Sequence, residues 1–286
     1  MTDSRPIGVF DSGVGGLTVL REIIRRTPLE PTIYLGDNER APYGTRPDEE
    51  VLAFSTQSLD ALVERDVKAL VVACNTSTAV GLTAFRRRYH LPVLGVIRPG
   101  ASAVTLATRN RQVGVIATPA TIRSHAYFNA IKDENPAVEV YEHATPALVP
   151  MVEAGILSGE VAESTVAESL AGLIGERDSD GESIFPRPPG AEIDTLLLGC
   201  THYPLLGSVI ANLVGDRVAI VDSATATASA LVELLSVNGL EAPDGAPPVH
   251  MQLTTGDPAR FEAVAGRLFG PDFVTAKPVD LGAAVS

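Results

Sequence analysis

The chain has 286 residues, enough for two domains of ordinary size, and 45% of them are hydrophobic and 20% charged. Its 22 Lys and Arg against 35 Asp and Glu give a net charge of −13, which disfavours nucleic acid and anionic membranes as partners. No apolar run approaches the roughly 18 residues that a membrane span needs, and no export signal precedes Ile7. We therefore expect a soluble, cytoplasmic protein.

Short apolar segments alternate with segments of helical period along the chain, which is typical of βαβ units around parallel sheets. Leu17, Leu20 and Ile24, for example, place apolar side chains three or four residues apart on one helix face. Irregular loops are expected at 176–190 and 241–248, where Pro, Gly and Asp gather. The sequence predicts an α/β protein with strands at 7–10, 32–36, 68–73, 92–96, 112–117, 137–141, 193–199, 217–222 and 248–253.

Two pairs of similar segments indicate that the halves of the chain share one plan. Residues 7–13 resemble 113–119, and residues 70–76 resemble 196–202. In the second pair a buried strand is followed by a cysteine and then by hydrogen-bonding residues. The breaker Pro99-Gly100 marks the predicted boundary. Because any α/β protein has strands of similar composition, the pattern alone does not decide whether the two halves are an internal repeat.

The two cysteines, Cys74 and Cys200, each follow a predicted strand. Two distant cysteines form neither a disulfide framework nor a zinc-type pair, so free thiols in a reducing compartment are expected. Ligands of parallel α/β sheets lie beyond the carboxyl ends of the strands, where a helix N-terminus lowers the pKa of a thiol. One isolated cysteine is usually a core residue, but two in the same uncommon context favour a functional site.

Other polar residues follow strands as well. Asp11 opens a glycine-rich turn that could bind an anion through backbone N–H groups, although a helix cap is the commoner role of such an aspartate. The turn lacks the G-x-G-x-x-G spacing, so a nicotinamide cofactor is weakly indicated even with Asp37 at the next strand end. Pro42, Tyr43 and Gly44 form either a plain turn or a lid of backbone donors.

The remaining candidates have weaker signals. Glu153 reads as an exposed helix residue near a glycine C-cap, and His202 lies two residues after Cys200 without further ligands for zinc. We therefore expect no metal. None of the lysines lies in a glycine-rich phosphate loop, which disfavours a pyridoxal enzyme; they are Lys68, Lys132 and Lys277.

Six motifs, in order along the chain, carry a family resemblance. They are Asp11–Leu17, Gly36–Asn38, Pro42–Gly44, Ala73–Thr76, Val152–Gly155 and Gly199–Pro204. Together they resemble the glutamate racemases of the aspartate/glutamate racemase superfamily. The resemblance implies cofactor-independent interconversion of L- and D-glutamate for peptidoglycan synthesis, with glutamate as the small-molecule partner. A homodimer is expected only from the general frequency of such assemblies.

The resemblance also implies two pseudo-symmetric, doubly wound α/β domains with mainly parallel sheets and the active site at their interface. The first domain is predicted to comprise residues 1–98 and 213–286, and the second residues 99–212. At the predicted crossing, Arg98 stands where the family often has an acidic residue.

The family's site residues map onto this sequence one by one. The resemblance makes Cys74 and Cys200 the two acid/base thiols on opposite faces of the substrate Cα. It places Asp11 beside the first thiol, and Glu153 and His202 beside the second. The implied substrate-binding residues are Asp11, Ser12, Tyr43, Gly44, Asn75, Thr76, Thr118, Thr121, Thr201 and His202.

The chemistry of racemisation agrees with two cysteines. A proton must leave one face of a carbon while another arrives on the opposite face, so two acid/base groups must flank it. For the L to D direction, Cys200 would be the thiolate and Cys74 the thiol. Alternatives remain open: a racemase of aspartate or another amino acid, a non-catalytic amino-acid-binding protein on the same scaffold, and, more distantly, a nicotinamide oxidoreductase.

Overall fold

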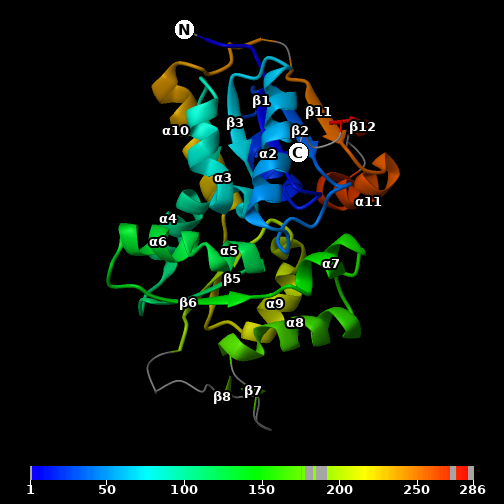
Figure 1. Cartoon of the computed structure of the whole chain (residues 1–286). Coiled ribbons are helices and arrows are strands. Elements are labelled where there is room, and N and C mark those ends of the chain that lie inside the picture. The colour runs from blue at the N-terminus through cyan, green and yellow to red at the C-terminus, as the bar shows by residue number, and fades with distance from the viewer. Residues whose placement is uncertain are drawn as a thin grey trace.

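Two mainly parallel sheets, one above the other in Figure 1, organise the chain. The computed structural model describes residues 2–174, 176–177, 183–184, 192–245, 247–270 and 275–282. In order, the first sheet contains β12 (Lys277–Pro278), β11 (His250–Thr254), β2 (Thr32–Gly36), β1 (Ile7–Asp11), β3 (Ala69–Val72) and β4 (Val93–Gly95). The second contains β10 (Ala219–Asp222), β9 (Thr195–Gly199), β5 (Gln112–Ala117) and β6 (Glu139–Ala144). The predicted α/β class is confirmed.

The central strands are continuous apolar runs because helices cover both of their faces. Every residue of β1, β3 and β9 is buried. All nine predicted strands are present, with ends that shift by a few residues. The short strand β12 was missed because its two residues, Lys277 and Pro278, carry no strand pattern.

The two sheets repeat one topology. The order β4-β3-β1-β2 in the first sheet matches β10-β9-β5-β6 in the second, strand for strand along the chain. The similar segments noted in the sequence are β1 with β5 and β3 with β9. Within each sheet the corresponding strands are parallel neighbours, β1 beside β3 and β5 beside β9. Each cysteine therefore follows the third strand of its own repeat.

The helices lie on the faces of these sheets (Figure 1). They are α1 (Leu17–Arg26), α2 (Asp48–Val63), α3 (Asn75–Arg88), α4 (Ile97–Ala107), α5 (Pro119–Arg123), α6 (Ala126–Glu134), α7 (Leu148–Glu153), α8 (Glu160–Ile174), the 3₁₀ helix η1 (Tyr203–Leu206), α9 (Gly207–Val214), α10 (Ala224–Asn238) and α11 (Pro258–Phe269).

Two of these helices each follow a strand of one sheet but pack against the other sheet. Helix α4 follows a strand of the first sheet, but its Ala101 and Val104 pack with Val113 of the second. Helix α10 follows a strand of the second sheet, and its Ala228 and Leu231 pack in the core of the first. The exchange ties the two halves together by burying apolar surface.

The chain thus crosses between the sheets twice. The first crossing is near the predicted residue 98, but Pro99 and Gly100 lie inside the first turns of α4 and do not break the chain there, since proline is tolerated in a first turn. For the return, the prediction at residue 213 would assign β10 to the first half, whereas β10 is hydrogen-bonded to β9. We propose that the return falls after Asp222.

The predicted loops have different outcomes. Residues 241–245 and 247–248 form no helix or strand, and Ala246 lies outside the described residues. In the segment 176–190, the antiparallel strands β7 (Glu176–Arg177) and β8 (Ser183–Ile184) correct the expectation of a plain loop. The rest of that segment lies outside the described residues.

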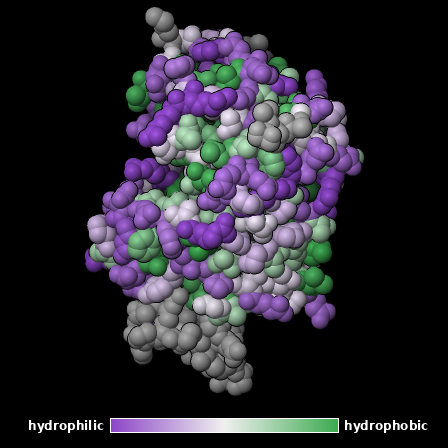
Figure 2. Space-filling model, in the orientation of Figure 1, coloured by the Kyte–Doolittle hydropathy of each residue, from purple (hydrophilic) through white to green (hydrophobic). Residues whose placement is uncertain are grey.

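The surface and the helices have two further properties. Hydrophilic residues cover most of the face in Figure 2, and apolar residues lie there in small separate groups. Among the helices that the structure describes, none is long and apolar enough to cross a membrane.

Arg98 is exposed on α4, 3.5 Å from the exposed Asp133. An exposed ion pair of this kind contributes little to stability.

Candidate active site

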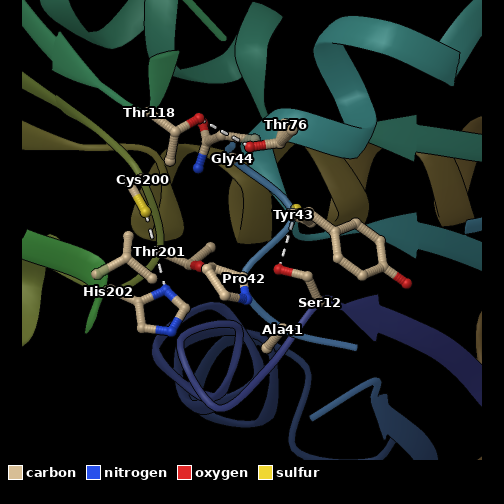
Figure 3. Close-up of a pocket in the computed structure, with 13 residues that line it drawn as sticks. Ser12, Ala41, Pro42, Tyr43, Gly44, Thr76, Thr118, Cys200, Thr201 and His202 are labelled. Atoms are coloured by element: carbon tan, nitrogen blue, oxygen red, sulfur yellow. Dashed lines mark hydrogen bonds between the residues drawn. The ribbon is translucent and has the colours of Figure 1, made fainter. Parts of the chain in front are cut away.

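A small cavity lies where the carboxyl ends of the two sheets face each other. Its volume is about 20 Å³. Both cysteines line it, Cys74 with 4% and Cys200 with 6% of its surface exposed. The other lining residues are Ser12, Ala41, Pro42, Tyr43, Gly44, Asn75, Thr76, Thr118, Val149, Thr201 and His202. Two thiols from different halves of the molecule therefore reach one enclosed space (Figure 3).

Cys74 lies at the junction of β3 and α3. It is the N-cap of α3, and its sulfur accepts a hydrogen bond from the Ser77 N–H at 3.4 Å. The thiol lies 3.4 Å from the Ser12 hydroxyl. Burial, followed by the charge of Asp11, raises the pKa of Cys74 against the hydrogen bonds from Ser12 and Ser77. The expected lowering by the helix N-terminus is therefore wrong for this thiol, because desolvation and the carboxylate outweigh it.

Asp11 ends β1 and is fully buried. Its carboxylate accepts hydrogen bonds from the Gly13 N–H at 3.0 Å and from the Thr201 hydroxyl of the second half at 3.2 Å. Burial raises the pKa of Asp11, while the charge of His202 and these donors oppose the rise. Asp11 does not cap α1, whose N-cap is Gly16 without a side-chain hydrogen bond. It is a buried carboxylate between the two halves.

Cys200 follows β9 and faces His202. Its sulfur lies 3.8 Å from Nδ1 of His202, and Nε2 of the same ring lies 2.7 Å from Oε1 of Glu153 (Figure 3 draws the first contact). Burial lowers the pKa of His202, but the hydrogen bonds and charges of Cys200 and Glu153 outweigh it and raise the pKa well above the ordinary value. The imidazolium form is thus favoured beside Cys200.

Glu153 ends α7 and is not the exposed residue that its spacing suggested. Its side chain is 16% exposed. Burial raises the pKa of Glu153, yet the hydrogen bond and charge of His202, the Val14 N–H and the charge of Arg260 together lower it. Arg260 of α11 also donates to the backbone oxygen of Glu153 at 2.7 Å.

The glycine-rich turn after β1 binds carboxylates of the protein itself. The N–H groups of Gly13 and Gly16 donate hydrogen bonds to the carboxylate of Asp11, and the N–H of Val14 donates to that of Glu153. A Cβ at Gly13 would lie 2.7 Å from Oε1 of Glu153, closer than atoms can pack. The anion-binding interpretation of this turn is correct in its chemistry, but these donors are already used inside the protein.

Three threonine hydroxyls from both halves meet beside the loop that carries Gly44. Thr76 Oγ1 lies 2.9 Å from Thr118 Oγ1 and 3.4 Å from Thr121 Oγ1 (Figure 3 shows the first pair). The Ala120 N–H donates to the Gly44 carbonyl at 3.0 Å. A Cβ at Gly44 would collide with Thr118. The loop closes onto the second half only because glycine stands there.

The hydroxyl of Tyr43 does not reach into the cavity. It donates to Asp37, which also accepts from Arg40 at 2.7 Å and from Thr255 at 2.8 Å. In Figure 3 the ring of Tyr43 points away from Cys200. Tyr43 can therefore offer a ligand its backbone, and Asp37 anchors the loop instead of a nicotinamide ribose.

The amide of Asn75 offers a free donor to the cavity. Its Oδ1 accepts a hydrogen bond from the Tyr127 hydroxyl at 2.6 Å, and its Nδ2 is buried with no partner among the described residues. Tyr127 lies on α6 and was not selected from the sequence, because an isolated tyrosine on a predicted helix carries no local signal.

Comparisons with known proteins agree with this geometry. The chain matches the Asp/Glu/Hydantoin racemase family over residues 7–231. The chain belongs to this family. A glutamate racemase of Geobacter metallireducens is 46% identical over 266 residues, which cover 93% of each chain.

Solved structures of family members have the same fold. A glutamate racemase isoform from Bacillus anthracis superposes with a TM-score of 0.85 at 41% identity, covering 97% of this chain and 98% of that one. Glutamate racemase from Francisella tularensis in complex with D-glutamate has a TM-score of 0.84 at 35% identity and covers 98% of both chains.

Most of the residues that the family resemblance singled out gather at this cavity. Asp11, Glu153 and Thr121 do not line it, but each contacts a residue that does. Among the described residues, no three His, Cys, Asp or Glu side chains are placed to bind a metal ion. The roles of the individual residues remain predictions, as does the expectation of no cofactor.

Proposed function

We propose that the chain is a glutamate racemase that moves protons at Cα with Cys74 and Cys200. The observation that carries this proposal is the approach of two free cysteines, one from each half, to one small cavity. Deprotonation on one face and reprotonation on the other require two such groups on opposite sides of a carbon.

In the proposed mechanism, the two sulfurs account for both protons that move in one turnover. From L-glutamate, the Cys200 thiolate takes the Cα proton while the Cys74 thiol gives its proton to the opposite face. The enzyme then holds a Cys200 thiol and a Cys74 thiolate, which is the form that acts on D-glutamate. In the proposed mechanism no external oxidant, reductant or cofactor is consumed.

The neighbours of each thiol differ in charge, which fits their assigned states. At Cys200, the ring of His202 lies 3.8 Å from the sulfur, and Glu153 helps to favour its imidazolium form. At Cys74, burial and Asp11 favour the protonated thiol. We propose that this difference prepares the resting enzyme for L-glutamate.

Substrate binding is assigned to donors that the protein leaves available. Asn75 Nδ2 is a buried donor without a partner among the described residues, and the hydroxyls of Ser12, Thr76, Thr118 and Thr201 border the cavity. They would hold the carboxylates and ammonium group of glutamate, together with the backbone of Tyr43 and Gly44 and with Thr121 behind Thr118. Fixed donors of this kind also stabilise the charge that develops as the proton leaves Cα.

The cellular setting is proposed on more general grounds. Two free, buried cysteines suit the reducing cytoplasm, and supply of D-glutamate to peptidoglycan precursors is the role that we propose. A homodimer is also proposed, since cyclic dimers are the commonest assemblies. Sedimentation equilibrium of the purified protein tests the dimer.

Exchange of the Cα proton in heavy water tests the proposed function. Starting from each enantiomer separately, the wild type is expected to incorporate deuterium at Cα of the product without added pyridoxal phosphate. L- and D-aspartate run in parallel identify the substrate. Exchange with aspartate but not with glutamate contradicts the proposed substrate, and no exchange with either contradicts the proposed function.

Single substitutions test the two thiols. Cys74→Ser and Cys200→Ser are each expected to abolish racemisation while the far-ultraviolet circular dichroism stays that of the wild type. If either variant retains near-parental turnover, that cysteine is not an acid/base group.

A further inference from the structure

Tyr127 is buried beside the cavity and lies close to the neighbour of each cysteine, Asn75 and Gly199. Its side chain is fully buried. A Cβ on Gly199, the residue before Cys200, would lie 2.9 Å from Cε2 of Tyr127, and its hydroxyl bonds to Asn75, the residue after Cys74. One side chain therefore spans the distance between the two halves at the level of the thiols.

The hydroxyl of Tyr127 acts as a hydrogen-bond donor to Asn75. Burial raises the pKa of Tyr127 far above its ordinary value, so the hydroxyl keeps its proton. Ser223, beside the crossing from β10 to α10, opposes this rise only in part. The protonated Tyr127 hydroxyl donates a hydrogen bond to Oδ1 of Asn75, 2.6 Å away.

This hydrogen bond determines which end of the Asn75 amide faces the cavity. An amide has an acceptor end and a donor end, and rotation by half a turn exchanges them. With Oδ1 held by Tyr127, Nδ2 is the end that remains, and it is buried without a partner among the described residues. If the amide turned over, its oxygen would confront any bound carboxylate.

We propose that Tyr127 is a positioning residue that holds the Asn75 amide with Nδ2 toward a carboxylate of the substrate. The proposal rests on the glutamate racemase function proposed above. It concerns the hydroxyl, because the ring could pack against Gly100 and Gly199 without it.

The test compares Tyr127→Phe with the wild type and with Tyr89→Phe. The Tyr127→Phe variant keeps the ring and removes one oxygen. Tyr89→Phe also removes a largely buried tyrosine hydroxyl, which hydrogen-bonds to Asp60 at 2.8 Å and to the Thr56 carbonyl at 3.2 Å, and neither of these residues lines the cavity. Its KM and kcat are expected to equal those of the wild type.

For Tyr127→Phe, KM for both L- and D-glutamate is expected to rise roughly ten-fold, because a hydrogen bond to a charged group is lost or reversed. The value of kcat is expected to change less than about three-fold, since both thiols and their partners stay in place. A KM within about two-fold of the wild-type value overturns the proposal.

A double-mutant cycle separates positioning from packing. In an Asn75→Ala background, Tyr127→Phe is expected to have no further effect on KM. If the two substitutions multiply, Tyr127 acts by another route and the proposal is wrong. In a Cys74→Ser background, which is expected not to turn over, calorimetric binding of D-glutamate gives the same comparison, and Tyr127→Phe is expected to weaken binding roughly ten-fold. A wild type that binds glutamate but does not racemise it refutes the proposed function, while the calorimetric comparison still tests the role of Tyr127.

Discussion

Oε1 of Glu153 lies 2.7 Å from Nε2 of His202, on the side of the ring opposite to Cys200. Burial opposes the charged form of both groups. His202 nevertheless helps to lower the pKa of Glu153, and Glu153 together with Cys200 raises the pKa of His202. The stability that His202 gains is fully present below its unfolded pKa of about 6.5 and is lost as pH rises through the higher folded value. The contribution of Glu153 is present above its unfolded pKa and is lost as pH falls through the lower folded value.

Glu153→Gln is expected to lower the pKa of His202, because the carboxylate that favours the imidazolium is gone. Because the positive charge beside Cys200 is then less populated, kcat should fall by about ten- to a hundred-fold. NMR titration of the five histidine rings measures the pKa, with His202→Asn assigning the signal. A His202 pKa equal to that of the wild type would show that the contact does not hold the proton.

His202→Asn is expected to reduce kcat for L-glutamate more than kcat for D-glutamate. In the L to D direction, Cys200 must start as a thiolate, and His202 lies beside it. Since the enantiomers have equal free energies in solution, kcat/KM falls equally in both directions, and the asymmetry must be sought in kcat. Circular dichroism of the reaction from each enantiomer provides both constants; equal losses of kcat count against the asymmetric role.

Asp11→Asn is expected to lower the pKa of Cys74. Burial is the larger cause of the raised pKa and stays, but the negative charge that also opposes the thiolate is removed. In a Cys200→Ser background only Cys74 titrates as a thiol, so ultraviolet thiolate absorbance against pH measures it. Should the titration move to higher pH or not at all, Asp11 does not act on this thiol.

Gly44→Ala is expected to lower both stability and activity. The added Cβ would collide with Thr118, so the loop carrying Tyr43 must move away from the second half. Overpacking of this kind costs about 1–3 kcal/mol. Gly266→Ala is the matched control, because nothing lies within 4 Å of the added Cβ inside α11.

The control should stabilise the protein by about 0.5–1 kcal/mol, since alanine favours a helix interior over glycine. Thermal unfolding measures both variants. If Gly44→Ala matches the control in Tm and kcat, the close contact between Gly44 and Thr118 is not needed for stability or activity, and the prediction is wrong.

The fold was predictable where local pattern and position agree. Apolar runs such as Leu70–Val72 fix buried parallel strands, and the polar residues after them fall at the carboxyl ends of the strands. That placement alone predicts that Cys74 and Cys200 face a cleft. The spacing of Glu153 suggested an exposed residue, because its partners, the Val14 N–H and the His202 ring, lie far away in the sequence.

The sequence by itself determined the strands and the two thiols at strand ends, because each depends on neighbouring residues in the chain. The strand orders of the two sheets decided the repeated plan, which the sequence had left open. The tertiary structure decided the exchange of α4 and α10, the use of the glycine turn by Asp11 and Glu153, and the bond from Tyr127 to Asn75. Apart from the bond between Asp11 and Gly13, these contacts join residues from different halves, and their distances are set by how the two sheets and their helices pack together. No local periodicity encodes that packing.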